Sequence, residues 1–224
     1  MINYLLPVAA VVLGFLFVLM FKPSKQTNLK LLLAFSGAFL LAITVFNLLP
    51  NIFEHSHGKH IGLFIMFGIL LQVFLEFFSK GAEHGHVHVH ANQHLFPWVL
   101  FTSLSIHAIL EGFPLHTHHT LVYGIVVHKI PIAIILTSFF LASQLSRFKT
   151  IIFLTLFAFM TPLGTYLSEH IGLLSEYITQ ITALVVGIFL HISTTILFES
   201  SEGHKFNVTK LIVIVLAIAI AYFV

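Results

Sequence analysis

Long, nearly uncharged apolar stretches are the feature that most limits what this chain can fold into. Hydrophobic residues make up 58% of the 224 residues and charged residues only 8%, and the mean hydropathy is +1.03. Soluble domains carry roughly a quarter charged residues, so this surface is unsuited to water. A membrane span needs about 20 apolar residues. The sequence contains eight candidate spans: 4–21, 29–51, 60–79, 97–115, 120–143, 149–168, 177–198 and 207–224.

These stretches predict an all-α polytopic membrane protein, with residues 1–224 forming one membrane domain of eight transmembrane helices. Lysine and arginine gather in the odd-numbered loops, namely Lys22, Lys25, Lys30, Lys80, Arg147, Lys149, Lys205 and Lys210. The even-numbered loops offer only Lys59. The positive-inside rule therefore places the odd loops in the cytoplasm and, with eight spans, both termini outside. We expect the protein in the cell membrane (inner or plasma membrane).

The third loop, 81–95, is a histidine-rich tract that this orientation places in the cytoplasm. Histidine is unusually common in the chain, with 16 residues, while cysteine is absent. Imidazole is the commonest side-chain metal ligand, and a tract this dense is metal-binding by composition. We predict that His84, His86, His88 and His90 bind metal as a cytosolic buffer or sensor.

The fourth and fifth spans carry ionisable residues where lipid tolerates few. His107 and Glu111 lie four residues apart, on one face of a helix, and His128 and Lys129 precede Pro131 in the next span. An ionisable residue inside a span marks a functional site by default. Imidazole and carboxylate together suit Zn²⁺, and also Fe²⁺ or Mn²⁺. The sequence therefore predicts a divalent-metal site on His107, Glu111 and His128, with Lys129 available to pair with a carboxylate.

Proline accompanies these polar residues. Pro114 is predicted to free the carbonyl of Leu110 and to kink the fourth span, and Pro162 follows Thr161 in the sixth. Broken helices at membrane depth are a common way for transporters to build ion sites.

Weaker candidates lie in other spans. Asn47 in the second span offers an amide oxygen to a cation on its pathway. His191 in the seventh is either an exit ligand or a hydrogen-bonding residue. Glu76 is expected to pair with Lys80 at a spacing of four residues.

At these residues the sequence resembles the ZIP (ZRT/IRT-like) family of metal transporters. That family carries H-S-x-x-(E/D)-G in its fourth helix and H-(K/E)-x-P-E-G in its fifth. Here residues 107–112 read H-A-I-L-E-G and residues 128–131 read H-K-I-P. Residues 47–51, N-L-L-P-N, are similar to the family's H-L-L-P-E. Residues 162–164 and 187–190 are similar to its P-L-G and G-x-F-L elements.

The resemblance implies a ZIP-like bundle with helices four and five at its core. It also implies movement of Zn²⁺ or a similar cation into the cytosol through a site on His107, Glu111 and His128. Three positions lack the polar or acidic residue of the family's pattern: Ala108, Ile132 and Thr161. We therefore expect one metal ion at the site rather than two.

The leading hypothesis is a transporter of divalent metal, with zinc preferred, and not an enzyme. No prosthetic group is expected. The expected partners are the metal ion and the lipid bilayer, with a homodimer as a candidate assembly. A net charge of +2 without a long basic run argues against nucleic acid.

Two alternatives remain open. A membrane-embedded metal sensor, or a family member that does not transport, would fit the missing acids. A di-iron membrane enzyme built on histidine boxes would need residues 84–94 and 116–119 on one side of the membrane. The charge rule places these two segments on opposite sides.

Overall fold

The computed structural model describes residues 1–21, 26–54, 58–79, 81–82, 96–143, 145–199 and 208–224. Every regular element in these residues is helical, which confirms the predicted all-α class. The long helices are α1 (Ile2–Phe21), α2 (Gln26–Ile43), α4 (Lys59–Ser79), α5 (Trp98–Gly112), α6 (Leu121–Ala142), α7 (Arg147–His170), α9 (Ile178–Glu199) and α10 (Val208–Tyr222). The short elements are η1 (Thr44–Leu48), α3 (Leu49–Glu54), η3 (Phe113–His116) and α8 (Gly172–Glu176).

Seven helical stretches in the described residues are long and apolar enough to cross a membrane. They correspond to the first seven predicted spans. The eighth corresponds to α10, which is apolar but has 15 residues. The number eight and the outward termini therefore stay predictions.

The outside of the bundle is covered by large apolar side chains. Leu13 of α1, Leu70 of α4 and Ile212 of α10 are each about 60% exposed. Contiguous apolar surface of this kind is unfavourable in water. Because helices satisfy their own backbone hydrogen bonds, such a surface suits the hydrocarbon of a bilayer.

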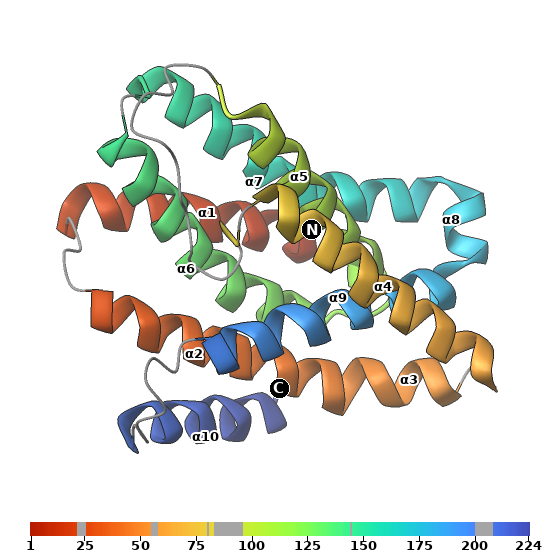
Figure 1. The fold of residues 1–224 in the computed structure, drawn as a ribbon. Helices are drawn as coiled ribbons and strands as arrows, with labels where there is room; N and C mark the ends of the chain where they lie inside the picture. The colour runs from red at the N-terminus through yellow and green to blue at the C-terminus, as the bar shows by residue number, and fades with distance from the viewer. Residues whose placement is uncertain (22–25, 55–57, 80, 83–95, 144, 200–207) are drawn as a thin grey trace.

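Helices α2 and α6 are central, whereas α1 and α4 are peripheral. Within the most apolar stretch of each helix, 61% of the residues of α6 are buried, compared with 22% of those of α4. α6 packs against α1, α2 and α7, while α5 packs against α4 and α7, and α9 against α4 and α2 (Figure 1). Polar residues on the inner faces of α5 and α6 are consequently enclosed by other helices.

Two pairs of helices approach each other closely at glycines. A Cβ atom at Gly164 in α7 would lie 2.0 Å from the carbonyl oxygen of Ile109 in α5. A Cβ atom at Gly187 in α9 would lie 2.0 Å from the carbonyl oxygen of Ile65 in α4. Only glycine permits this separation, so these residues bring the α5–α7 and α4–α9 backbones into contact.

Irregular turns interrupt two of the helical stretches. α2 passes into the π-helical turn η1, and α5 passes into the 3-10 turn η3, which contains Pro114. The predicted kink at Pro114 stays a prediction; at this point the chain passes from α-helix into the 3-10 turn. The predicted free carbonyl at Leu110 is wrong, because the N–H of Phe113 donates to it. A 3-10 turn pairs residues three apart and so satisfies the carbonyl that proline would leave open.

Candidate metal site

Glu111 of α5 lies at the centre of a buried polar cluster between α5, α6 and α7. His107 precedes it by one turn, and its Nε2 lies 3.5 Å from Oε2 of Glu111. His128 of α6 faces His107, with the ring centroids 6.3 Å apart. The three predicted ligands are each no more than 3% exposed. The fold therefore gathers in its interior the three residues that the sequence selected.

Two further groups hold the Glu111 carboxylate. Nζ of Lys129 lies 2.5 Å from Oε1, and the hydroxyl of Thr161 in α7 donates to the same oxygen at 2.6 Å. Nζ also lies 4.6 Å from the centroid of the Phe157 ring, where a cation is attracted to the ring face. We call His107, Glu111, His128, Lys129 and Thr161 the α5–α6 cluster.

The contact of Thr161 with Glu111 was not predicted from the sequence. There Thr161 stands as the polar residue before Pro162 and as the position of a missing acid. Its contact with Glu111 depends on how α5 and α7 pack, and no local pattern in the sequence reveals it. A threonine next to Pro162 at membrane depth was the available signal.

The cluster leaves one side of the carboxylate open. A buried carboxylate is unfavourable unless it is paired and hydrogen-bonded, and Oε1 of Glu111 meets both conditions. Oε2 faces His107, whose ring nitrogens have no hydrogen-bond partner in the described part of the chain. Two ligands of one tetrahedral zinc ion, at about 2.1 Å each, lie roughly 3.4 Å apart. The 3.5 Å between Oε2 and Nε2 matches that separation.

The third ligand is less well placed. Among the described residues, no group of three histidine or acidic side chains is arranged to hold an ion as it stands. His128 would have to move toward Oε2 of Glu111 and Nε2 of His107 to complete a set.

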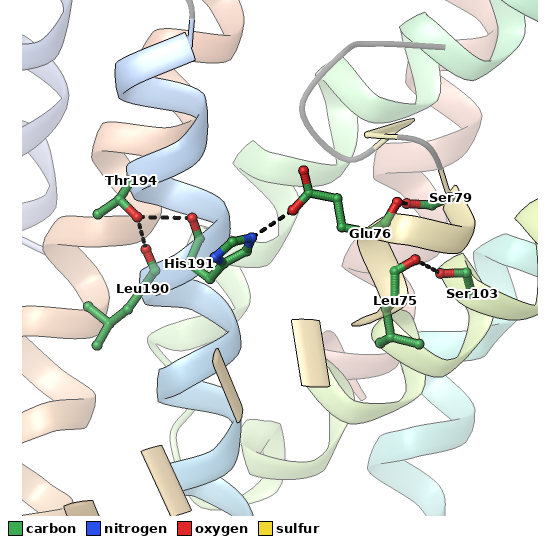
Figure 2. Close-up of polar contacts among 7 residues, drawn as sticks. All are labelled: Leu75, Glu76, Ser79, Ser103, Leu190, His191 and Thr194. Carbon is green, nitrogen blue, oxygen red and sulfur yellow. Dashed lines mark hydrogen bonds and ion pairs between the residues drawn. The ribbon is translucent and has the colours of Figure 1, made fainter. Parts of the chain in front are cut away.

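The two weaker candidates have partners outside this cluster. Asn47 lies in η1, and its Nδ2 donates to the hydroxyl of Thr120 at 3.1 Å. Nε2 of His191 in α9 lies 2.7 Å from Oε2 of Glu76 in α4, and Figure 2 shows the two side chains bridging the helices. The expected partner of Glu76, Lys80, lies outside the described residues.

His84, His86, His88 and His90 lie outside the described residues. The expectation that they bind metal therefore stays a prediction, as does the alternative of histidine boxes that would include them.

A pocket of about 230 Å³ lies at the end of the bundle that the charge rule assigns to the outside. It opens between the end of α3, the turn after η3 and the start of α9. Its lining is Asn51, Ile52, Thr117, His118, Ile178, Thr179 and Thr182. Asn47 precedes Asn51 by four residues in the same segment, within the π-helical turn η1.

The described residues hold seven long apolar helices with a lipid-suited surface around an enclosed ionisable cluster, which is the arrangement of a multi-pass membrane protein. No family model matches the chain. Over 88 residues the chain is 32% identical to the zinc transporter ZIP1 of zebrafish, Danio rerio. The match covers 37% of this chain and 29% of that protein, so it spans less than a third of the relative's length.

Proposed function

We propose that this protein carries a divalent metal cation across a cell membrane, with Zn²⁺ as the preferred cargo and the cytoplasm as its destination. The observation that carries the proposal is the buried pairing of Glu111 with His107, whose facing atoms are spaced like two ligands of one ion. The partial similarity to a zinc transporter supports the same class of cargo. His128 is the third proposed ligand, and water or a backbone carbonyl supplies the fourth.

The donor set fits a borderline divalent metal. Two imidazoles and one carboxylate are ligands that Zn²⁺ accepts in tetrahedral sites with one open position. Fe²⁺ and Mn²⁺ accept the same ligands with different geometry. Because Ile132 supplies no donor and Thr161 supplies only a hydroxyl, the proposed site holds one ion.

Lys129 supplies a counter-charge to Glu111. While its ammonium lies against Glu111, the buried carboxylate is neutralised without metal. An arriving cation interacts with Oε2, the oxygen on the His107 side, and repels the ammonium across the carboxylate. We propose that Lys129 therefore weakens metal binding enough for the ion to leave again, which a transport site requires.

The proposed route begins at the pocket near His118. Asn51 lines this pocket, and Asn47 lies four residues earlier in the same segment. Neutral amide oxygens and imidazoles attract a hydrated cation without binding it tightly. We place the outward opening here because the positive-inside rule assigns this end to the outside.

A second candidate function is a metal sensor that does not transport. The observation that favours it is the contact of Lys129 and Thr161 with Glu111, which already satisfies Oε1. A sensor would bind metal and change conformation without releasing it to the other side.

Uptake of radiolabelled Zn²⁺ into proteoliposomes tests the proposal. We expect transport by the wild type and none by Glu111→Ala or His128→Ala. His60→Ala is the matched control, because His60 is exposed at the start of α4 and lies outside the cluster. A wild type that binds Zn²⁺ but moves neither Zn²⁺, Fe²⁺ nor Mn²⁺ would contradict transport and favour the sensor.

A further inference from the structure

Gln72 is a fully buried polar residue on an otherwise lipid-facing helix. The buried positions of α4 are Ile61, Gly68, Gln72, Leu75 and Ser79. Gln72 is 0% exposed, and neither its amide nitrogen nor its amide oxygen has a hydrogen-bond partner among the described residues. An unpaired buried amide is destabilising. Packing therefore does not explain why a glutamine occupies this position.

The contacts between α4 and α9 show where Gln72 lies along the seam between these two helices. A Cβ atom at Gly68 would lie 2.0 Å from the carbonyl oxygen of Leu184 in α9. Further along α4, Glu76 contacts His191 of α9. Gln72 comes one helical turn after Gly68 and one turn before Glu76. All three residues of α4 lie on one face, so Gln72 lies on the seam between these two contacts.

The contact of α4 with α5 places Gln72 at the depth of the metal site. The hydroxyl of Ser103 in α5 donates to the carbonyl of Leu75 at 2.6 Å, and Figure 2 shows this crossing beside Glu76. Successive membrane helices run in opposite directions. Gln72 lies one turn before Glu76 in α4, and His107 lies one turn after Ser103 in α5. Because α4 and α5 are antiparallel, these two steps go in the same direction across the membrane, so Gln72 and His107 lie at a similar depth.

We propose that Gln72 is a ligand on the ion's path, and that its amide oxygen holds the cation between the α5–α6 cluster and the Glu76–His191 pair. This inference rests on the proposed function. An amide oxygen is an uncharged ligand for a divalent cation, so it holds the ion briefly and lets it pass on. The seam between α4, α5 and α9 thereby continues the path from His107 toward the end of α4 at Ser79.

The chemistry of the residue fits a passing cation. A cation, or the water that accompanies it, would satisfy the buried amide oxygen during transport.

The test replaces Gln72 with residues that keep its shape or its oxygen. Gln72→Met keeps the length and removes the amide, and Gln72→Glu keeps a ligand oxygen and adds charge. Thr137→Val is the matched control, because the Thr137 hydroxyl in α6 is also buried without a hydrogen-bond partner in the described residues. For each full-length variant we would measure the initial rate of radiolabelled Zn²⁺ uptake in proteoliposomes, and the melting temperature in detergent.

We expect Gln72→Met to lower uptake about tenfold, the scale of a lost supporting group at a metal site. Its melting temperature should stay equal or rise, because an unpaired amide has been replaced by an apolar group. Gln72→Glu should lower both KM and the maximal rate, because a carboxylate holds the ion longer. Thr137→Val should transport like the wild type.

Wild-type uptake by Gln72→Met, with uptake abolished in Glu111→Ala, would overturn the role of Gln72 and leave the proposed function standing. A fall in melting temperature with lost uptake in both Gln72 variants would also overturn it, because the residue would then be structural. Absence of wild-type uptake for Zn²⁺, Fe²⁺ and Mn²⁺ would overturn both proposals together.

Discussion

The α5–α6 cluster and the Glu76–His191 pair both join a carboxylate to an imidazole, but their surroundings differ. Glu111 is 1% exposed and receives an ammonium and a hydroxyl on one oxygen. The side chains of Glu76 and His191 are 25% and 19% exposed. Electrostatic interactions are stronger between buried groups, in a low-dielectric interior, than between partly exposed groups. The same two residue types therefore suit a selective site in one place and an easily broken contact in the other.

The largest effect should come from removing the charge of Glu111. In Glu111→Gln, the Lys129 ammonium loses its buried partner, and we expect a loss of about 3–5 kcal/mol in the free energy of unfolding. Zn²⁺ uptake should fall to background. Thermal unfolding in detergent and proteoliposome uptake measure the two effects.

The double variant Glu111→Gln with Lys129→Met separates these effects. It removes both charges, so stability should recover toward the wild type while uptake stays absent. If Glu111→Gln alone unfolds like the wild type, the ion pair does not have the strength that its burial implies.

Gly164 and Gly187 extend the comparison to the helix contacts around the two sites. Gly164→Ala and Gly187→Ala each place a Cβ atom against a backbone carbonyl, so each should lower the free energy of unfolding by about 2 kcal/mol. Only Gly164→Ala displaces α5 from α7, where Thr161 contacts Glu111. We expect its uptake to fall more than that of Gly187→Ala, measured at equal amounts of folded protein.

Gly62→Ala is the control for both variants, since nothing lies within 4 Å of a Cβ atom at that position. Its stability and uptake should match the wild type. Equal loss of uptake in Gly164→Ala and Gly187→Ala would show that the α5–α7 contact has no special importance for the site.

Thr161→Val tests the hydroxyl that distinguishes the buried cluster. Its bond to a charged carboxylate should contribute about 1.5 kcal/mol to the free energy of unfolding. Without it, we expect a severalfold change in the KM for Zn²⁺, because Glu111 is held on that side by Lys129 alone. Thr165→Val is the comparison, since its hydroxyl bonds the Gly112 and Thr161 carbonyls and not Glu111. The two KM values should differ, and equal values would contradict a role for the Thr161 hydroxyl in positioning Glu111.

The smallest effect should come from Glu76→Gln. A partly exposed contact between a carboxylate and an imidazole contributes less than about 1 kcal/mol to stability, and glutamine retains a hydrogen-bonding oxygen and a similar shape. We expect a melting temperature within a few degrees of the wild type and a change of about twofold in uptake. Destabilisation as large as that of Glu111→Gln would remove the distinction between the two sites.

The sequence by itself determined which residues can share a local face. Helical periodicity places His107 beside Glu111, because residues four apart meet on a helix. Apolar length and the scarcity of charge predicted the helical, lipid-suited bundle, and the seven long apolar stretches bear this out. Proline predicted a kink and a free carbonyl at Leu110, but the 3-10 turn at Pro114 gives that carbonyl the Phe113 N–H as a partner.

Only the tertiary structure decided which side chains meet across helices. Thr161 reaches Glu111 from a helix fifty residues further along the chain, and Glu76 meets His191 across 115 residues. These contacts depend on the rotation and spacing of packed helices, which glycines such as Gly164 and Gly187 set through backbone contact. The periodicity within one helix does not predict how that helix packs against another. Gln72 could be recognised as unusual only after the fold showed it to be buried and without a partner in the described residues.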